Sequence, residues 1–177
     1  MQATGHRGFT LIELLVTIAI AAILATIAVP EFRAFLMNIQ IKTATEAINN
    51  GLQLARGEAV RRNTNVRFRL GAGTAWTVGC ETSTADCPAV IQSRAAGEGS
   101  ASATVTTVPA GATAITYNGF GRVVANDDGT PSITSFNIDV PTTVLAASQS
   151  KDLSIITTGG SIRMCDPNGI TGDPRTC

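Results

Sequence analysis

The feature that most constrains the fold is the apolar run Phe9–Val29, in which Glu13 is the only charged residue. A helix over this run would be about 31 Å long at ~1.5 Å per residue, which matches the hydrocarbon core of a bilayer. A carboxylate at such a depth costs about 2.5–3.5 kcal/mol on insertion scales. We therefore expect a specific role for Glu13.

Two ordinary explanations of such a run do not fit. A cleaved secretory signal has basic residues, a shorter apolar core and then a small-residue cleavage site. Here the run is longer, and the small residue Gly8 stands before it. A plain membrane anchor, the other explanation, gives no reason for Glu13.

The hexapeptide G-F-T-L-I-E, Gly8 to Glu13, follows a short leader that contains Arg7. It resembles the class III signal of type IV pilins and type II secretion pseudopilins. The resemblance implies that a prepilin peptidase cuts between Gly8 and Phe9 and methylates Phe9. It places the mature chain in the bacterial inner membrane, with its body in the periplasm, and later in the pilus fibre or tip.

The same resemblance puts Glu13 at the fifth mature position, where the family has its glutamate. In a bundle of apolar helices, this carboxylate can pair with the buried N-terminal ammonium of Phe9 on a neighbouring subunit. Because an isolated buried charge is strongly unfavourable, such a pair would set the register between subunits.

Beyond Pro30, apolar residues recur every three or four positions, as on one face of an amphipathic helix. They are Phe32, Leu36, Ile39, Ala44, Ile48, Leu52, Ala55 and Ala59. We expect one helix over Phe9–Arg62, weakened at Gly51 and Gly57 by about 1 kcal/mol each and ending at Asn63–Asn65. The expected organisation is a leader (1–8), a membrane or fibre-core helix (9–29), an amphipathic half-helix (30–63) and a β-rich body (64–177).

Two further segments resemble one branch of the family. Leu54–Asn63, L-A-R-G-E-A-V-R-R-N, is similar to the segment that ends the long helix in GspH/FimT proteins. Gly159–Pro167, G-G-S-I-R-M-C-D-P, resembles the branch's C-terminal GR-x-R-x-CDP motif. The resemblance implies an α+β type IV pilin fold, with the long helix packed on a mostly antiparallel sheet or sandwich.

The residue pattern of the body predicts short strands separated by turn residues, among them Asp127–Gly129 and Thr158–Gly160. Ala95–Thr104, which is rich in small residues, is expected to be an exposed loop. The expected strands are Val66–Leu70, Ala75–Gly79, Ala89–Ser93, Thr104–Val108, Ala114–Tyr117, Ile133–Val140, Leu153–Thr157 and Ser161–Met164.

The four cysteines form two local pairs, Cys80/Cys87 and Cys165/Cys177. Short separations and an export signal favour disulfides, each stabilising by about 2–4 kcal/mol, although three connectivities exist. A four-thiolate zinc site is the alternative, but neither pair has the usual close ligand spacing. We expect no metal and no cofactor.

Some FimT-like minor pilins bind DNA through the two arginines of the C-terminal motif. Here Ser161 replaces the first arginine, and Arg163 retains the second. The surrounding tail is not basic, so DNA is a possible partner that we do not favour. Instead, Arg163 would face solvent or pair with Asp166. A second basic cluster, offset only by Glu58, is expected to be a solvated surface or a contact with the next subunit: Arg56, Arg61, Arg62, Arg67 and Arg69.

Thirteen basic and thirteen acidic residues leave no global field that would attract nucleic acid or anionic lipid. The only histidine is His6, and no nucleophile, phosphate loop or metal spacing is recognisable, so an enzyme is not expected. The favoured function is a minor pilin that helps prime assembly at the pilus tip together with other minor and major pilins. The alternatives are a DNA-binding minor pilin of natural transformation and a type II secretion pseudopilin.

Overall fold

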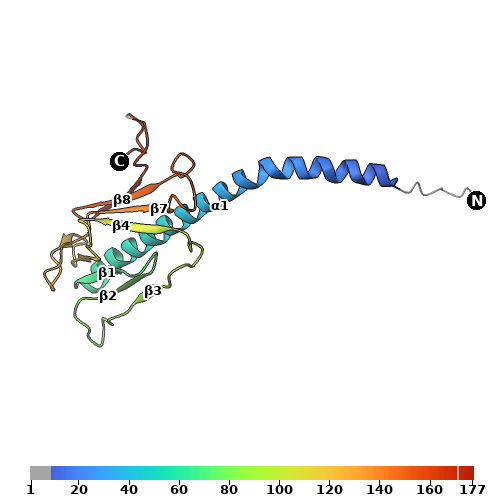
Figure 1. Ribbon diagram of the computed structural model, residues 1–177. Coiled ribbons are helices and arrows are strands. Elements are labelled where there is room, and N and C mark those ends of the chain that lie inside the picture. The colour runs from blue at the N-terminus through green and yellow to red at the C-terminus, as the bar shows by residue number, and fades with distance from the viewer. Residues whose placement is uncertain (1–8, 171) are drawn as a thin grey trace, which may run out of the picture. The chain divides into compact units, whose positions relative to one another are not determined.

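The structure, a computed structural model, describes residues 9–170 and 172–177 (Figure 1). The leader expected at 1–8, including Gly8, lies outside these residues. The chain divides into two compact units, Met1–Phe35 and Leu36–Cys177. A single helix, α1 (Leu11–Arg62), contributes residues to both units.

Helix α1 has a defined hydrogen-bonded signal at each end. At its start, Thr10 and Glu13 form a reciprocal capping box, in which the Glu13 N–H donates to Thr10 Oγ1 (3.3 Å) and the Thr10 N–H to Glu13 Oε2 (3.5 Å). Pro30 lies within the helix and does not end it. At the other end, Asn63 adopts φ +48° and the Thr64 N–H bonds to the Ala59 carbonyl, as in a Schellman termination.

The buried stripe of α1 in the second unit differs in part from the predicted one. Ala44, Ile48, Leu52, Ala55 and Ala59 are buried as expected, and Ile41 extends the stripe. Leu36 and Ile39, however, are exposed, so this part of the prediction is wrong, while Phe32 belongs to the first unit. Ile39 precedes Ala44 by five residues, about 140° around the helix, whereas Ile41 precedes it by three, about 60°.

The body contains nine strands in two sheets among the described residues, and every paired neighbour is antiparallel. The first sheet has the order β3 (Gln92–Arg94), β2 (Trp76–Cys80), β1 (Val66–Leu70), β5 (Ala114–Tyr117) and β6 (Val123–Val124). The second has the order β4 (Thr104–Val108), β7 (Ser135–Asp139), β8 (Leu153–Thr158) and β9 (Ser161–Cys165). The α+β fold is thereby confirmed, with β6 as an additional strand.

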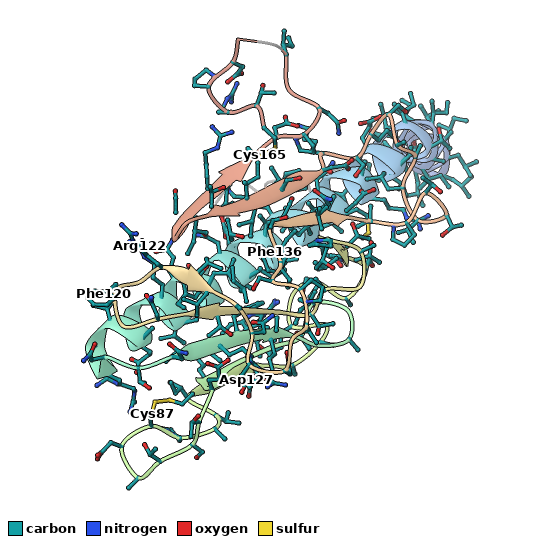
Figure 2. The ribbon with its side chains drawn as sticks, turned by 90° about the vertical axis from the view of Figure 1, so that its left-hand side faces the viewer. Cys87, Phe120, Arg122, Asp127, Phe136 and Cys165 are labelled. Carbon is teal, nitrogen blue, oxygen red and sulfur yellow. A yellow bond between two sulfur atoms is a disulfide. The ribbon has the colours of Figure 1, made fainter. Side chains whose placement is uncertain are left out.

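The core lies where both sheets meet the second half of α1. In Figure 1, β4, β7 and β8 lie above this half of the helix and β1, β2 and β3 below it. Phe68 of β1 contacts Trp76 of β2 and Phe136 of β7, with ring centroids 5.9 and 5.8 Å apart. Phe136 is labelled in Figure 2. This aromatic cluster packs the two sheets directly against each other.

Two disulfides fix the ends of strands. Cys80–Cys87 closes the loop after β2, and Cys165–Cys177 ties the last residue of the chain to the end of β9. Both local cysteine pairs are therefore bonded, and no thiolate is left for the zinc alternative. The expected loop at Ala95–Thr104 forms turns that are mostly exposed, although Ser100 and Ala103 are buried.

Candidate functional site

The N-terminal part of α1 leaves its apolar side chains without a partner in the described chain. An 18-residue window of this helix has a mean hydropathy of 2.6 and none of it is buried, so by length and composition it could cross a membrane. Thr17 and Thr26 donate their hydroxyls to carbonyls three residues earlier, which satisfies them inside the apolar segment.

Phe9 and Glu13 stand at the start of this segment. Both are exposed, and among the residues that the structure describes Glu13 reaches only the backbone N–H of Thr10, through the capping box. A threonine followed three residues later by glutamate is the sequence signature of this box. The interpretation of Glu13 as an assembly residue did not use this signal. The carboxylate of Glu13 is thus ordered at the helix end yet open to a second partner. Cleavage after Gly8, which lies outside the described residues, and methylation of Phe9 stay predictions.

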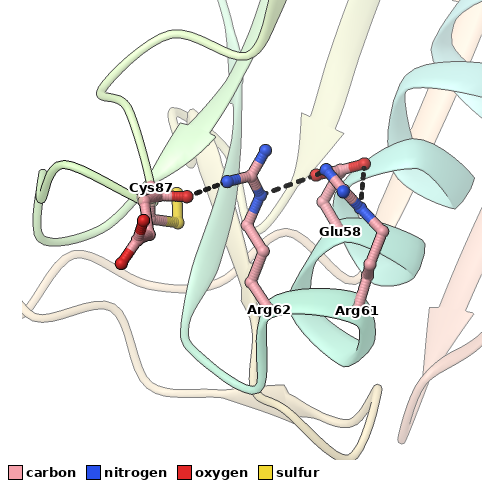
Figure 3. Close-up of a disulfide and its surroundings, with 6 residues drawn as sticks. Glu58, Arg61, Arg62 and Cys87 are labelled. Carbon is pink, nitrogen blue, oxygen red and sulfur yellow. Dashed lines mark hydrogen bonds and ion pairs between the residues drawn. A yellow bond between two sulfur atoms is a disulfide. The ribbon is translucent and has the colours of Figure 1, made fainter.

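Within the expected basic cluster at the end of α1, Arg61 and Arg62 both pair with Glu58. Glu58 accepts hydrogen bonds from Arg61 Nη2 at 2.6 Å and from Arg62 Nε at 2.7 Å (Figure 3). The Arg61 guanidinium, and then that of Arg62, hold the pKa of Glu58 below its usual range despite its partial burial. Arg62 also donates to the Asp86 carbonyl beside Cys87, so it ties the helix end to the first disulfide loop.

Arg67 contradicts the prediction of a solvated surface or intersubunit contact. Its side chain is 2% exposed, and it binds Glu81, Asp127 and Asp128. Its Nε donates to Thr116 Oγ1 at 3.1 Å. Burial by itself lowers the pKa of Arg67, but the hydrogen bonds to Asp127 and Glu81 outweigh it, so the net direction is upward.

The prediction failed at Arg67 because the carboxylates that neutralise it lie far away in sequence. Glu81 follows β2, and Asp127 and Asp128 belong to the turn after β6. The role of Arg67 is therefore to hold that turn against the first sheet.

Ser161 and Arg163, the candidate DNA-binding positions, lie on β9 and are both exposed. Arg163 Nη2 donates to the backbone carbonyl of Thr176 at 2.9 Å. The expected pairing with Asp166 does not occur among the described residues, since Asp166 accepts instead from the Asn168 N–H. Nearby, Arg175 bonds Asp173 and lowers the pKa of that carboxyl to about 2. Arg163 thus braces the C-terminal loop.

An exposed aromatic and an arginine that sequence reasoning missed lie on the turn between β5 and β6. Phe120 is 84% exposed, and Arg122 is exposed two residues later, as Figure 2 shows at the edge of the body. The turn is fixed because the Asn118 side chain accepts from the N–H groups of Phe120 and Arg122. The segment N-G-F-G-R was the available signal, a turn with an apolar residue at its tip.

Two family descriptions match this chain, one over its N-terminal segment and one over most of the remainder. A family described as "Type II transport protein GspH" matches residues 44–176, and the "Prokaryotic N-terminal methylation motif" matches residues 4–29. Two crystal forms of the type IV minor pilin FimU from Pseudomonas aeruginosa PAO1 are also similar, at 20% identity with a TM-score of 0.46 and at 19% with 0.48. Both alignments cover 70% of this chain, and they cover 87% and 90% of FimU.

Proposed function

Because the chain belongs to the GspH family of pilin-like proteins and carries its methylation motif, we propose that it is a minor pilin of a type IV pilus. It would act as a structural and priming subunit at or near the tip. The observation that supports a filament subunit of this kind is the contrast within α1. Its first part exposes an apolar surface, whereas the part in the second unit buries one face in a completed core.

The mechanism follows from the chemistry of the two exposed N-terminal groups. Before assembly, the apolar segment would lie in the inner membrane with the body in the periplasm. In the filament, these segments would pack together, since the described chain provides nothing else to cover them. Glu13 would then accept a hydrogen bond from the methylated ammonium of Phe9 on a neighbouring subunit. Prepilin peptidase would act first, because only cleavage after Gly8 creates that ammonium.

Two other roles share this fold. The matching family is named for type II transport, which favours a pseudopilin of type II secretion, whereas FimU is a type IV minor pilin. DNA uptake would rest on Arg163, whose guanidinium forms no ion pair with any described residue but donates to Thr176. A single arginine that already donates to a backbone carbonyl is a weak phosphate site, so DNA uptake ranks behind the structural role.

One experiment separates the three roles. The gene is deleted in its source bacterium and complemented with the wild-type chain or with Arg163→Gln. We expect the deletion to reduce surface pili and leave protein secretion unchanged, and we expect Arg163→Gln to restore both pili and DNA uptake. Lost secretion with normal pili would assign a pseudopilin, and normal pili with lost uptake in Arg163→Gln would assign a DNA-binding subunit.

A further inference from the structure

Strand β9 ends the second sheet and has one side without a partner strand in the described chain. Thr157 of β8 is opposite Ile162 of β9, and the Thr157 N–H donates to the Thr134 carbonyl, on the side of β7, at 2.9 Å. The pair Thr157–Ile162 is therefore one that exchanges no backbone hydrogen bonds. The N–H and C=O of Ile162 consequently point away from β8, toward the free edge.

An open groove of about 560 Å³ runs between this part of β9 and α1. Its apolar lining comes from Val60 of α1 and Ile162 of β9. Gly57 lies in the same groove, and a Cβ atom added there would meet nothing within 4 Å. The groove thus has room beside the free backbone groups of Ile162.

The rim of the groove is positively charged. Arg56 and Arg61 line it, and Arg61 is bonded to Glu58. Gly121 packs on the same end, because a Cβ atom on it would lie 3.1 Å from Arg56 Nε, and the exposed Arg122 follows it in the chain. Within residues 9–170 and 172–177, neither Arg56 nor Arg122 has a salt-bridge partner.

We propose that this groove binds an extended acidic segment of a partner protein, which adds to the free edge of β9 as a further strand. Side chains of an extended strand alternate between two faces. The face toward α1 would lay an apolar side chain on Val60 and Ile162 and a carboxylate on Arg56, one helical turn from Val60, and a further carboxylate would approach Arg122. The backbone of the segment would pair with Ile162, as in other cases of strand addition.

A peptide accounts for more of the site than a nucleic acid does. Phosphates would satisfy the arginines, but they would leave the edge groups of Ile162 and the apolar lining unused. The assignment holds whether the filament belongs to a pilus or to a secretion system, because it rests on the second unit alone.

The test uses the full mature chain in detergent micelles and a fluorescein-labelled peptide of about six residues, the usual strand length, in which pairs of Val alternate with pairs of Glu so that each face carries both residue types. Two control peptides replace Glu by Lys or Val by Pro. The Lys peptide keeps the β propensity and reverses the charge, and the Pro peptide keeps the charge but cannot pair as a strand. Fluorescence anisotropy should show binding of the Glu–Val peptide at least about tenfold tighter than of either control.

Two variants address the two halves of the site. The double change Arg56→Gln and Arg122→Gln should weaken binding about tenfold, as two exposed charge contacts would. Ile162→Pro removes the outward N–H while keeping the ladder to β8, so it should weaken binding more than Ile162→Ala does. A thermal melt of each variant shows whether the body remains folded.

Specific outcomes would overturn the proposal. The first is equal binding of the Glu–Val and Glu–Pro peptides by the wild-type chain, a result that needs no variant to fold. The second is the absence of any binding at low salt. The third is competition by duplex DNA that depends on Arg56 and Arg122 and is equally strong in Ile162→Pro and Ile162→Ala. Such a result would make the groove a phosphate site.

Discussion

At the scale of single residues, Arg67 is the most consequential side chain of the body. Its guanidinium is nearly removed from water, and so is the carboxylate of Glu81, which is 7% exposed. Buried pairs of this kind contribute little relative to apolar residues of the same size, but the loss of one partner leaves the other charge uncompensated. The turn carrying Asp127 and Asp128 depends on the same arginine.

We therefore predict that Arg67→Met destabilises the body by about 3–5 kcal/mol. The matched control is Arg69→Met, at an exposed position of the same strand, which should change stability by less than about 0.5 kcal/mol. Urea unfolding of both variants can be followed through the fluorescence of Trp76, the only tryptophan. Equal effects of the two changes would contradict the role assigned to Arg67.

A second residue-scale prediction concerns the interacting carboxyls of Asp139 and Asp152. The Ser150 hydroxyl donates to Asp139 at 2.6 Å and, despite burial, helps to keep the pKa of Asp139 lowered. Burial, together with the charge of Asp139, raises the pKa of Asp152 above its ordinary value of 3.8. A raised pKa means that ionising Asp152 costs stability, and this loss develops as the pH rises from about 3.8 through the raised pKa.

Asp152→Asn should remove that loss. We expect it to raise the melting temperature at pH 7 by about 1–3 °C and to have no such effect near pH 3, where Asp152 is protonated. Thermal melts at the two pH values measure this directly. A stabilisation that is the same at both would show that the gain does not come from the charge of Asp152.

At the scale of elements, the two glycines within α1 have opposite surroundings. A Cβ atom on Gly51 would lie 2.8 Å from the Phe68 ring and 3.1 Å from the indole of Trp76. On Gly57 it would meet nothing within 4 Å. Gly51 is therefore required by the close approach of the sheet, whereas Gly57 only weakens the helix.

Alanine at these two positions should change stability in opposite directions. Gly57→Ala should stabilise by about 0.5–1 kcal/mol through helix propensity and the entropy of the unfolded chain. Gly51→Ala should destabilise by about 1–3 kcal/mol, because its methyl group forces the aromatic cluster apart. Comparison of the urea midpoints suffices, and the same sign for both changes would be incompatible with the packing described here.

Most of the elements could be predicted from local patterns, and the failures have a common physical origin. The helix end at Arg62 and the strands Val66–Leu70, Thr104–Val108 and Ala114–Tyr117 coincide with the predicted ranges, because caps, turns and alternation are local. β3 lies at Gln92–Arg94 instead of Ala89–Ser93, and β6 was missed. Both are short edge strands, which form because a neighbouring strand is present.

The candidate residues divide in the same way. Glu13 and the local cysteine pairs follow from nearby sequence, so their positions could be anticipated. The burial of Arg67, the brace from Arg163 to Thr176 and the site of Phe120 depend on contacts between segments far apart in the chain. No periodicity in the sequence encodes such contacts.

At the scale of the whole molecule, the two units meet different requirements. The second encloses its own core and fixes strand ends with two disulfides. The first presents apolar side chains that need a bilayer or other helices. Under the proposed function, the first unit would be covered only in the membrane or in the filament, and Glu13 would set the register of assembly.

The most direct measurement is the amount of the chain in sheared filaments when it carries Glu13→Ala, with Glu31→Ala as a control exposed on the same helix. Total protein and melting temperature are compared in parallel, to show that the body is unaffected. We predict that Glu13→Ala lowers incorporation at least about tenfold, since a buried ammonium would lose its partner at a cost above about 3 kcal/mol. We expect Glu31→Ala to incorporate normally. Wild-type incorporation of Glu13→Ala would contradict the role of Glu13 in assembly.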